Sequence, residues 1–214
     1  MKKTRKVMFA AGCGLIVLFI LWTVLVRFVD VRQIGPRDST VGFAKVNGYV
    51  HGITGVNMLL YTVTDWLGIV PIGVAFCFAV SGFVQLIKRK SIFKVDKSVL
   101  SMGGFYIAVL TVYIFFEITV INYRPVLING VLEASYPSST TMLAMCIMTT
   151  AMIHLNARAK SKMFRRCISA VISAFIAFMV IGRLISGVHW FSDIIAGILI
   201  SAGLVTVYAS VSDI

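Results

Sequence analysis

The residues best suited to chemistry lie near the end of the chain, in the segment GRLISGVHWFSDIIAG at positions 182–197. This segment sets Arg183, His189 and Asp193 among apolar neighbours. His189 and Asp193 are four residues apart, so on a helix they would share one face. A carboxylate that is hydrogen-bonded to one ring nitrogen of a histidine makes the other nitrogen a better nucleophile or base. We therefore expect His189 to be the reactive group and Asp193 to orient it.

Two arginines could hold a phosphate group beside this histidine. Arg183 precedes His189 in the same segment, and Arg124 stands before a proline in EITVINYRPVL at 117–127. The planar guanidinium group matches phosphate oxygens with two parallel hydrogen bonds. The pair therefore predicts an anion-binding site.

A third segment, SYPSSTT at 135–141, adds hydroxyl groups. Ser138 and Ser139 follow a proline and precede an apolar run, which is the pattern of a helix start. The first N–H groups of a helix are free there, and the helix dipole favours an anion. Together with the arginines and the histidine, this indicates phosphoryl transfer. We expect no metal, because one histidine and one aspartate are too few ligands.

The elements that must bring these segments together are membrane spans. Of the 214 residues, 59% are hydrophobic and 13% are charged, whereas a soluble domain carries about a quarter charged residues. Apolar runs of roughly 20 residues, enough to cross the hydrocarbon, recur along the chain. We predict an all-α fold, a single membrane domain over 1–214 built as a bundle of six transmembrane helices. The spans are placed at about 7–26, 69–87, 99–116, 140–155, 167–181 and 191–209.

The segment 40–66, between the first two spans, is mixed in polarity. Its apolar residues recur at helical spacing: Tyr49, Ile53, Val56, Leu59, Leu60 and Val63. This favours an extra amphipathic helix lying in the interface on the outer side, and a packed extracellular loop is the alternative. Such a helix could shape a lateral opening for a lipid. His51 and Asp65 could line the entry path.

Basic residues predict the orientation of the bundle. Of the 20 Lys and Arg residues, 14 lie in three short connections: MKKTRK at the N-terminus, KRKSIFKVDK at 88–97 and RAKSKMFRR at 158–166. The positive-inside rule places all three in the cytoplasm. Both termini are then inside and the three reactive segments outside, in what we expect to be a bacterial cytoplasmic membrane. Because short basic clusters beside apolar spans indicate topology, we expect no nucleic-acid partner.

The three reactive segments resemble the signature of the membrane-bound type 2 phosphatidic acid phosphatases, the lipid phosphate phosphatase superfamily. The family pattern is KxxxxxxRP, PSGH and SRxxxxxHxxxD, and this chain has EITVINYRP, PSST and GRLISGVHWFSD in the same order. The resemblance runs from about residue 70 to the end. It implies a six-helix fold with the site at the outer leaflet, a phosphohistidine on His189 oriented by Asp193, and no metal or cofactor. The implied phosphate ligands are Arg124, Ser138, Arg183 and the N–H groups near Ser139.

Three positions depart from the family pattern. Glu117 stands in place of the lysine, Gly182 in place of the serine, and Thr140 in place of the second histidine. In the family that histidine protonates the leaving group, and losing a general acid costs about 10² to 10⁴ in rate. A lipid diphosphate, such as a polyprenyl diphosphate, would need little acid help, because phosphate leaves more readily than a lipid alkoxide. Alternatively, Glu117 supplies the proton.

We therefore predict an integral membrane phosphatase that removes phosphate from a lipid phosphate or diphosphate at the outer face. Its partners are this lipid and the membrane lipids, while the sequence leaves the oligomeric state open. One alternative is a non-catalytic relative that binds lipid headgroups, in which Glu117 pairs with Arg124 or Arg183. Another is an unrelated small transporter. A transporter would have polar groups at mid-membrane, and the spans hold few of these.

Overall fold

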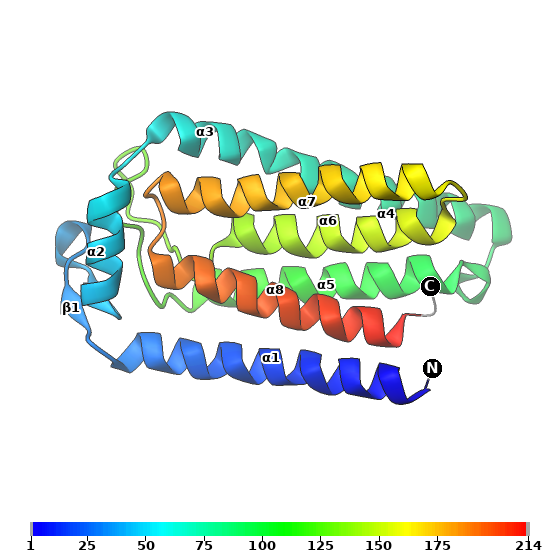
Figure 1. Ribbon diagram of the computed structural model, residues 1–214, viewed down its shortest axis with the longest axis horizontal. Coiled ribbons are helices and arrows are strands. Elements are labelled where there is room, and N and C mark those ends of the chain that lie inside the picture. Colours follow the sequence, from blue (N-terminus) through cyan, green and yellow to red (C-terminus); the bar gives the residue numbers. More distant parts are fainter. Residues whose placement is uncertain (1, 213–214) are drawn as a thin grey trace.

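The apolar runs of the chain form six long helices in the computed structural model, which describes residues 2–212. Each is long and apolar enough to cross a membrane. The prediction of a six-span, all-helical bundle is therefore confirmed, and Figure 1 shows the helices running side by side. They are α1 (Lys2–Phe28), α4 (Ile69–Arg89), α5 (Lys97–Ile118), α6 (Ser139–Arg158), α7 (Lys162–Ile185) and α8 (Phe191–Val211).

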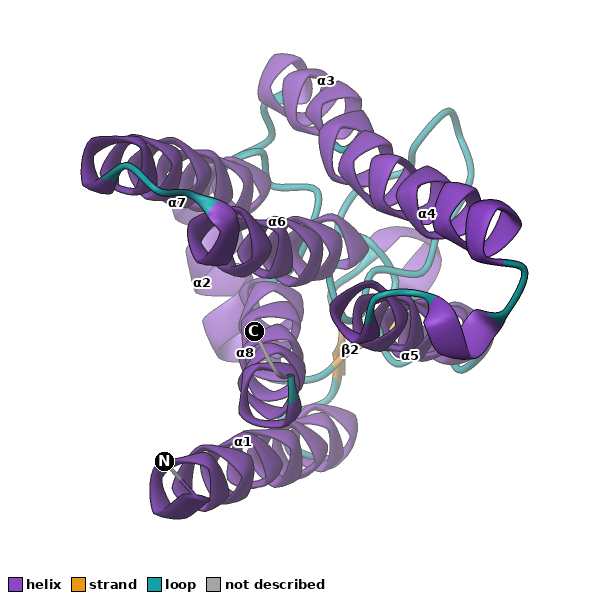
Figure 2. Cartoon of the chain, turned by 90° about the vertical axis from the view of Figure 1, so that its right-hand side faces the viewer, coloured by secondary structure: helices purple, strands orange, loops and turns teal. Residues whose placement is uncertain are grey.

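Helix α6 lies inside the bundle, with α4, α7 and α8 packed around it (Figure 2). Half of its apolar window is buried, the largest share among the six spans. Helix α1 lies at the edge and packs on α8 (Figures 1 and 2). The outward faces of the spans carry exposed apolar side chains, among them Phe76, Ile107 and Val171. Such a surface is suited to contact with lipid rather than water.

The segment between α1 and α4 contains short elements. Strands β1 (Arg32–Gln33) and β2 (Thr40–Val41) pair antiparallel around the 3-10 helix η1 (Pro36–Asp38). Helices α2 (Ala44–Thr54) and α3 (Met58–Leu67) follow. Helix α2 lies across the end of the bundle, and α3 continues into α4 (Figure 1).

The single amphipathic helix expected over 40–66 is therefore two helices. Gly55 ends α2 with a φ of +59°, a conformation that glycine adopts without steric cost. Asn57 begins α3, because its side-chain oxygen accepts a hydrogen bond from the Leu60 N–H. The periodicity of the apolar residues thus found the helical conformation, but not the break between the two helices.

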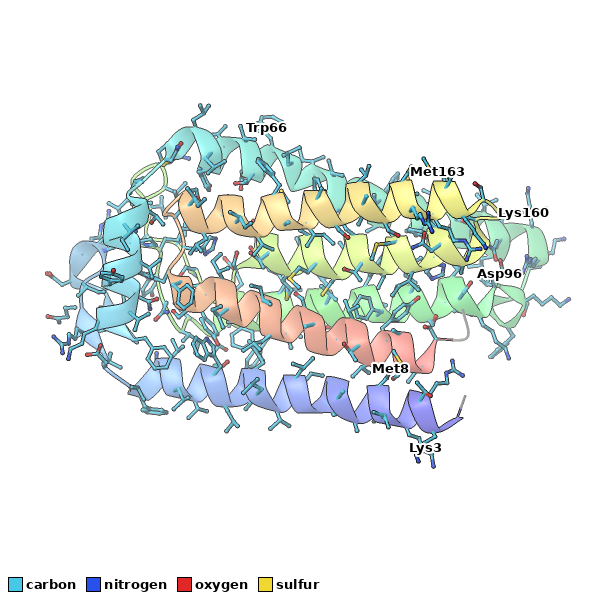
Figure 3. All side chains as sticks on the ribbon, in the orientation of Figure 1. Lys3, Met8, Trp66, Asp96, Lys160 and Met163 are labelled. Atoms are coloured by element: carbon cyan, nitrogen blue, oxygen red, sulfur yellow. The ribbon has the colours of Figure 1, made fainter. Side chains whose placement is uncertain are left out.

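The two ends of the bundle differ in composition. One end carries the start of α1, the end of α8, and the connections that include η2 (Ile92–Lys94) and residues 159–161. Lys3, Asp96 and Lys160 mark this end in Figure 3. The opposite end carries α2, the 119–138 loop and the α7–α8 turn (Figure 1). The three basic clusters and the three reactive segments therefore lie at opposite ends.

The 119–138 loop folds back on itself as an irregular hairpin. Asn129 and Gly130 have φ values of +51° and +75°, which is the left-handed pair that closes a tight antiparallel turn. Ile128 and Val131 pair across this turn. The hairpin brings the two arms of the loop together above the end of α5 and the start of α6.

Candidate active site

A pocket of about 290 Å³ lies where the three reactive segments meet. Its walls come from the end of α5, the 119–138 loop, the start of α6 and the turn before α8. Among the predicted site residues, its lining includes Glu117, Arg124, Ser139 and His189. The tertiary structure thus gathers groups that are up to 72 positions apart in the sequence.

His189 lies in the turn between α7 and α8 and is only 3% exposed. Its Nδ1 is 3.1 Å from the carbonyl oxygen of Ser135. Since a carbonyl oxygen only accepts hydrogen bonds, Nδ1 carries the proton and Nε2 keeps its lone pair. Across residues 2–212, this buried Nε2 has no hydrogen-bond partner. The ring therefore offers a free nucleophilic nitrogen at the pocket.

The surroundings of His189 favour the neutral ring. Burial lowers the pKa of His189 from its ordinary value of 6.5 to about 4. The negative charge of Asp193 raises this pKa, whereas the positive charges of Arg124 and Arg183 lower it. At pH 7 the ring is consequently uncharged, which is the protonation state that a nucleophile needs.

The expectation that His189 and Asp193 share a helix face is corrected by the structure. Helix α8 begins at Phe191, so His189 precedes the helix and Asp193 lies in its first turn. Asp193 Oδ2 accepts a hydrogen bond from the Trp190 N–H at 3.0 Å and lies 3.8 Å from His189 Nδ1. The carboxylate caps the helix, because the first N–H groups of a helix lack intrahelical partners. The Ser135 carbonyl, rather than Asp193, accepts the histidine proton, and Asp193 adds negative charge nearby.

Asp193 is itself held by an asparagine that the sequence analysis did not single out. The carboxylate is completely buried, and Asn122 Nδ2 donates to its Oδ1 at 3.0 Å. A second asparagine, Asn47 on α2, binds Ser192 through both its amide oxygen and its amide nitrogen. These bonds fasten the 119–138 loop and α2 to the start of α8. No pattern in the sequence distinguishes these two asparagines, which stand beside other polar residues such as Arg124 and Lys45.

Arg124 is paired with Glu133 across the hairpin. Its Nε lies 3.0 Å from Glu133 Oε2, and its backbone N–H donates to the Glu133 carbonyl at 3.0 Å. Arg124 Nη1 is buried and has no hydrogen-bond partner among the described residues. The outer part of the guanidinium group is thus available for an anion. Glu133 was missed by the sequence analysis, although the Asn129-Gly130 pair is typical of the turn that sets it opposite Arg124.

Arg183 does not line this pocket but points toward α3. Its side chain is 1% exposed; Nη2 lies 3.3 Å from Asp65 Oδ1, and Nη1 lies 3.4 Å from Thr64 Oγ1. The Cζ atoms of Arg183 and Arg124 lie 4.8 and 5.9 Å from the centre of the Tyr61 ring. Both guanidinium groups therefore contact one aromatic ring. Arg183 Nε is buried without a hydrogen-bond partner in the described part of the chain.

The close approach of α3 gives a physical reason for glycine at position 182. A Cβ atom on Gly182 would lie 2.8 Å from Thr64 Cγ2, closer than two carbon atoms pack. Gly187 has a φ of +67°, and a Cβ there would lie 1.8 Å from the Gly55 carbonyl oxygen. The α2–α3 junction is therefore docked directly on the turn that carries His189.

The serines at the start of α6 have different positions. Ser138 Oγ is buried and accepts a hydrogen bond from the Thr141 N–H at 3.5 Å, so it caps α6 instead of lining the pocket. Ser139 is the first residue of α6 and lines the pocket, which places the first helical N–H groups beside it. The lining does not include Thr140.

Glu117 lines the pocket from the end of α5, where it is exposed. Glu117 forms no ion pair with either arginine, although such a pair was expected for a non-catalytic relative. Arg124 pairs with Glu133, and Arg183 pairs with Asp65. The Glu117 carboxylate makes no ion pair or hydrogen bond within residues 2–212.

The chain and its fold are similar to known proteins. The family model described as PAP2 superfamily matches residues 105–213, which contain all three reactive segments. No curated protein sequence matches the chain. The fold is similar to that in the crystal structure of the first transmembrane PAP2 type phosphatidylglycerolphosphate phosphatase from Bacillus subtilis. The TM-score is 0.55, with 15% identity and 93% of each chain covered.

Proposed function

Because this chain belongs to the PAP2 superfamily, we propose that it is a lipid phosphatase that uses His189 as its nucleophile. It is an integral membrane protein with the fold of a membrane phosphatase. The observation that carries the proposal is the free, buried Nε2 of His189 in a pocket that also holds Arg124 and the start of α6. The substrate is a lipid phosphate or a lipid diphosphate.

The reaction proceeds in two displacements. His189 Nε2 attacks phosphorus, so that an N–P bond forms and the bond from phosphorus to the leaving oxygen breaks. The ring gains positive charge in this step, while Nδ1–H remains bonded to the Ser135 carbonyl. The Asp193 carboxylate, 3.8 Å away, stabilises that charge. Water then attacks the phosphohistidine, the N–P bond breaks, and inorganic phosphate leaves.

Phosphate oxygens are held by groups that are otherwise unpartnered. Arg124 Nη1 and the N–H groups of the first α6 turn, beside Ser139, are available at the pocket. Arg183 Nε, outside the pocket lining, is another buried donor without a hydrogen-bond partner among the described residues. Ser138 contributes by holding the first turn of α6 in place. Metal ions have no step in this scheme.

The leaving group accounts for the absence of a second histidine. Thr140 does not line the pocket, and its hydroxyl is a weak acid. Glu117 lines the pocket from an exposed position at the end of α5. A diphosphate substrate needs less acid help, because attack on its terminal phosphorus expels a lipid monophosphate rather than an alkoxide. We therefore favour a lipid diphosphate, with polyprenyl diphosphates as the first class to test.

The basic clusters support an orientation with both termini in the cytoplasm and the pocket at the outer face. The clusters lie at the end opposite the pocket (Figures 1 and 3). A lipid in the outer leaflet would approach beside α3, whose Asp65 and Tyr61 contact Arg183. Its tail can remain in hydrocarbon while the headgroup reaches His189. Such a path would suit a bacterial cytoplasmic membrane.

Phosphate release by the detergent-purified protein tests the function. A polyprenyl diphosphate and a phosphatidic acid are compared without added metal, with His189→Gln as the matched variant. We expect release that requires His189, faster from the diphosphate, and acid-labile radioactive phosphate on the wild-type protein alone. Lipid binding without release would refute catalysis. It would favour the headgroup-binding relative, a role to which the two carboxylate-paired arginines are also suited.

A further inference from the structure

The pocket lining contains more acidic than basic side chains. Glu117 and Glu133 both line it, against a single guanidinium group from Arg124. Glu133 already pairs with this arginine at 3.0 Å, and Glu117 has no partner among the described residues. Arg183, the second arginine nearby, is paired with Asp65. A phosphate group bound by itself would therefore meet surplus negative charge.

The same pocket nevertheless contains buried polar groups that could bind an anion. His189 and Arg124 are 3% and 9% exposed, and their Nε2 and Nη1 atoms lack hydrogen-bond partners in the described chain. Buried polar atoms of native proteins normally have partners. One part of the pocket is thus built for phosphate, while the two glutamates give it a negative part.

Aromatic side chains also line this pocket. Tyr113, Phe116 and Tyr136 all belong to it. The face of an aromatic ring attracts a cationic group such as an ammonium, and carboxylates bind the same group as ion pairs. The pocket therefore has the chemistry for a headgroup that carries both charges.

We propose that the substrate headgroup carries an ammonium group close to its phosphate, and that Glu117 and Glu133 bind this ammonium. The substrate class is then an amino-alcohol or amino-sugar phosphate or diphosphate lipid. A polyprenyl diphosphate has no ammonium group, so it tests the leaving group but not this selection. The inference rests on the proposed function and adds the selection of the headgroup. It also gives Glu117 a role: a lysine at this position would repel the ammonium group, whereas a carboxylate attracts it.

A matched pair of lipids tests the inference. Sphingosine 1-phosphate carries a free ammonium group, and its N-acetyl derivative has the same phosphate and the same leaving oxygen without that charge. Release of phosphate is measured from both in detergent with EDTA. We expect wild-type kcat/KM to be about 5- to 10-fold higher for the ammonium lipid, as for one or two partly exposed ion pairs.

Variants assign the preference to the two glutamates. Glu117→Gln and Glu133→Gln keep the size of the side chain, and each is expected to lower the substrate ratio toward 1. Glu117→Lys should reverse the preference. Asp96→Asn is the matched control, since it removes the same charge from the opposite end of the bundle and should leave the ratio unchanged.

The possible failures are distinguishable. Equal His189-dependent rates on both lipids would overturn the inference and leave the phosphatase function standing. A preference for the ammonium lipid that survives both glutamine variants would also overturn the inference. Phosphate release that requires Mg²⁺ would do the same, since magnesium can bridge carboxylates and phosphates. The absence of His189-dependent release from these lipids, from phosphatidic acid and from polyprenyl diphosphate would overturn both proposals.

Discussion

The low pKa of His189 leads to a quantitative prediction for the pH dependence of activity. A histidine with a pKa of about 4 is about 90% neutral at pH 5. A histidine with the ordinary value of about 6.5 is only about 3% neutral at that pH. If neutral His189 is the nucleophile, kcat/KM at pH 5 is therefore expected to stay close to its plateau.

The assay is a profile of kcat/KM from pH 3 to 8 with a lipid phosphate and a lipid diphosphate. Because the phosphate groups also ionise, the limb that belongs to the enzyme is the one that both substrates share. Asp193→Asn removes the charge that raises the pKa of His189, so its acid limb should move to lower pH. A shared wild-type limb between pH 6 and 7 would refute the argument that burial keeps this ring neutral.

The same shift has a consequence for stability. The pKa of His189 is lower in the folded protein, so between about pH 4 and 6.5 the unfolded chain binds more protons. The stabilisation present above pH 6.5 is lost as the pH falls, and the loss amounts to about 2 kcal/mol at pH 5. His189→Gln should lose less thermal stability between pH 7 and 5 than the wild type does. Identical losses would contradict this.

Three further predictions concern positioning and topology. Asn122→Ala leaves the buried Asp193 carboxylate without one donor, and should lower the free energy of unfolding by about 1–3 kcal/mol in denaturant titrations. Gly182→Ser brings a Cβ against Thr64 and should lower Tm. Adding Thr64→Ala to this variant should restore most of the lost Tm, and no recovery would contradict the contact. In a protein without native cysteines, Lys160→Cys should react with an impermeant maleimide only from the cytoplasmic side.

The membrane spans could be predicted because their cause is local. Inside a bilayer the backbone must satisfy its own hydrogen bonds, so a long apolar run has to become a helix. The runs in this chain all did so, and their basic connections lie at one end. The motif spacing likewise predicted the family, and the match of the family model to residues 105–213 confirms it.

Predictions that required an exact local geometry were less successful. The pairing of His189 with Asp193 assumed that both residues lie within one helix, but α8 starts between them. The expected amphipathic helix is interrupted at Gly55, where the left-handed backbone ends α2. In both cases the sequence spacing indicated helical structure, but the residue at which a helix begins or ends decided which side chains are in contact.

The partners of the charged groups were decided by tertiary structure. Arg183 and Asp65 are 118 positions apart, and they meet only because α3 packs against the bare backbone of Gly182. No local pattern encodes such a pair, since its energy depends on how two helices approach. The sequence by itself therefore determined the spans and the family. Packing alone decided which carboxylate each arginine binds, and hence the charge that a substrate meets in the pocket.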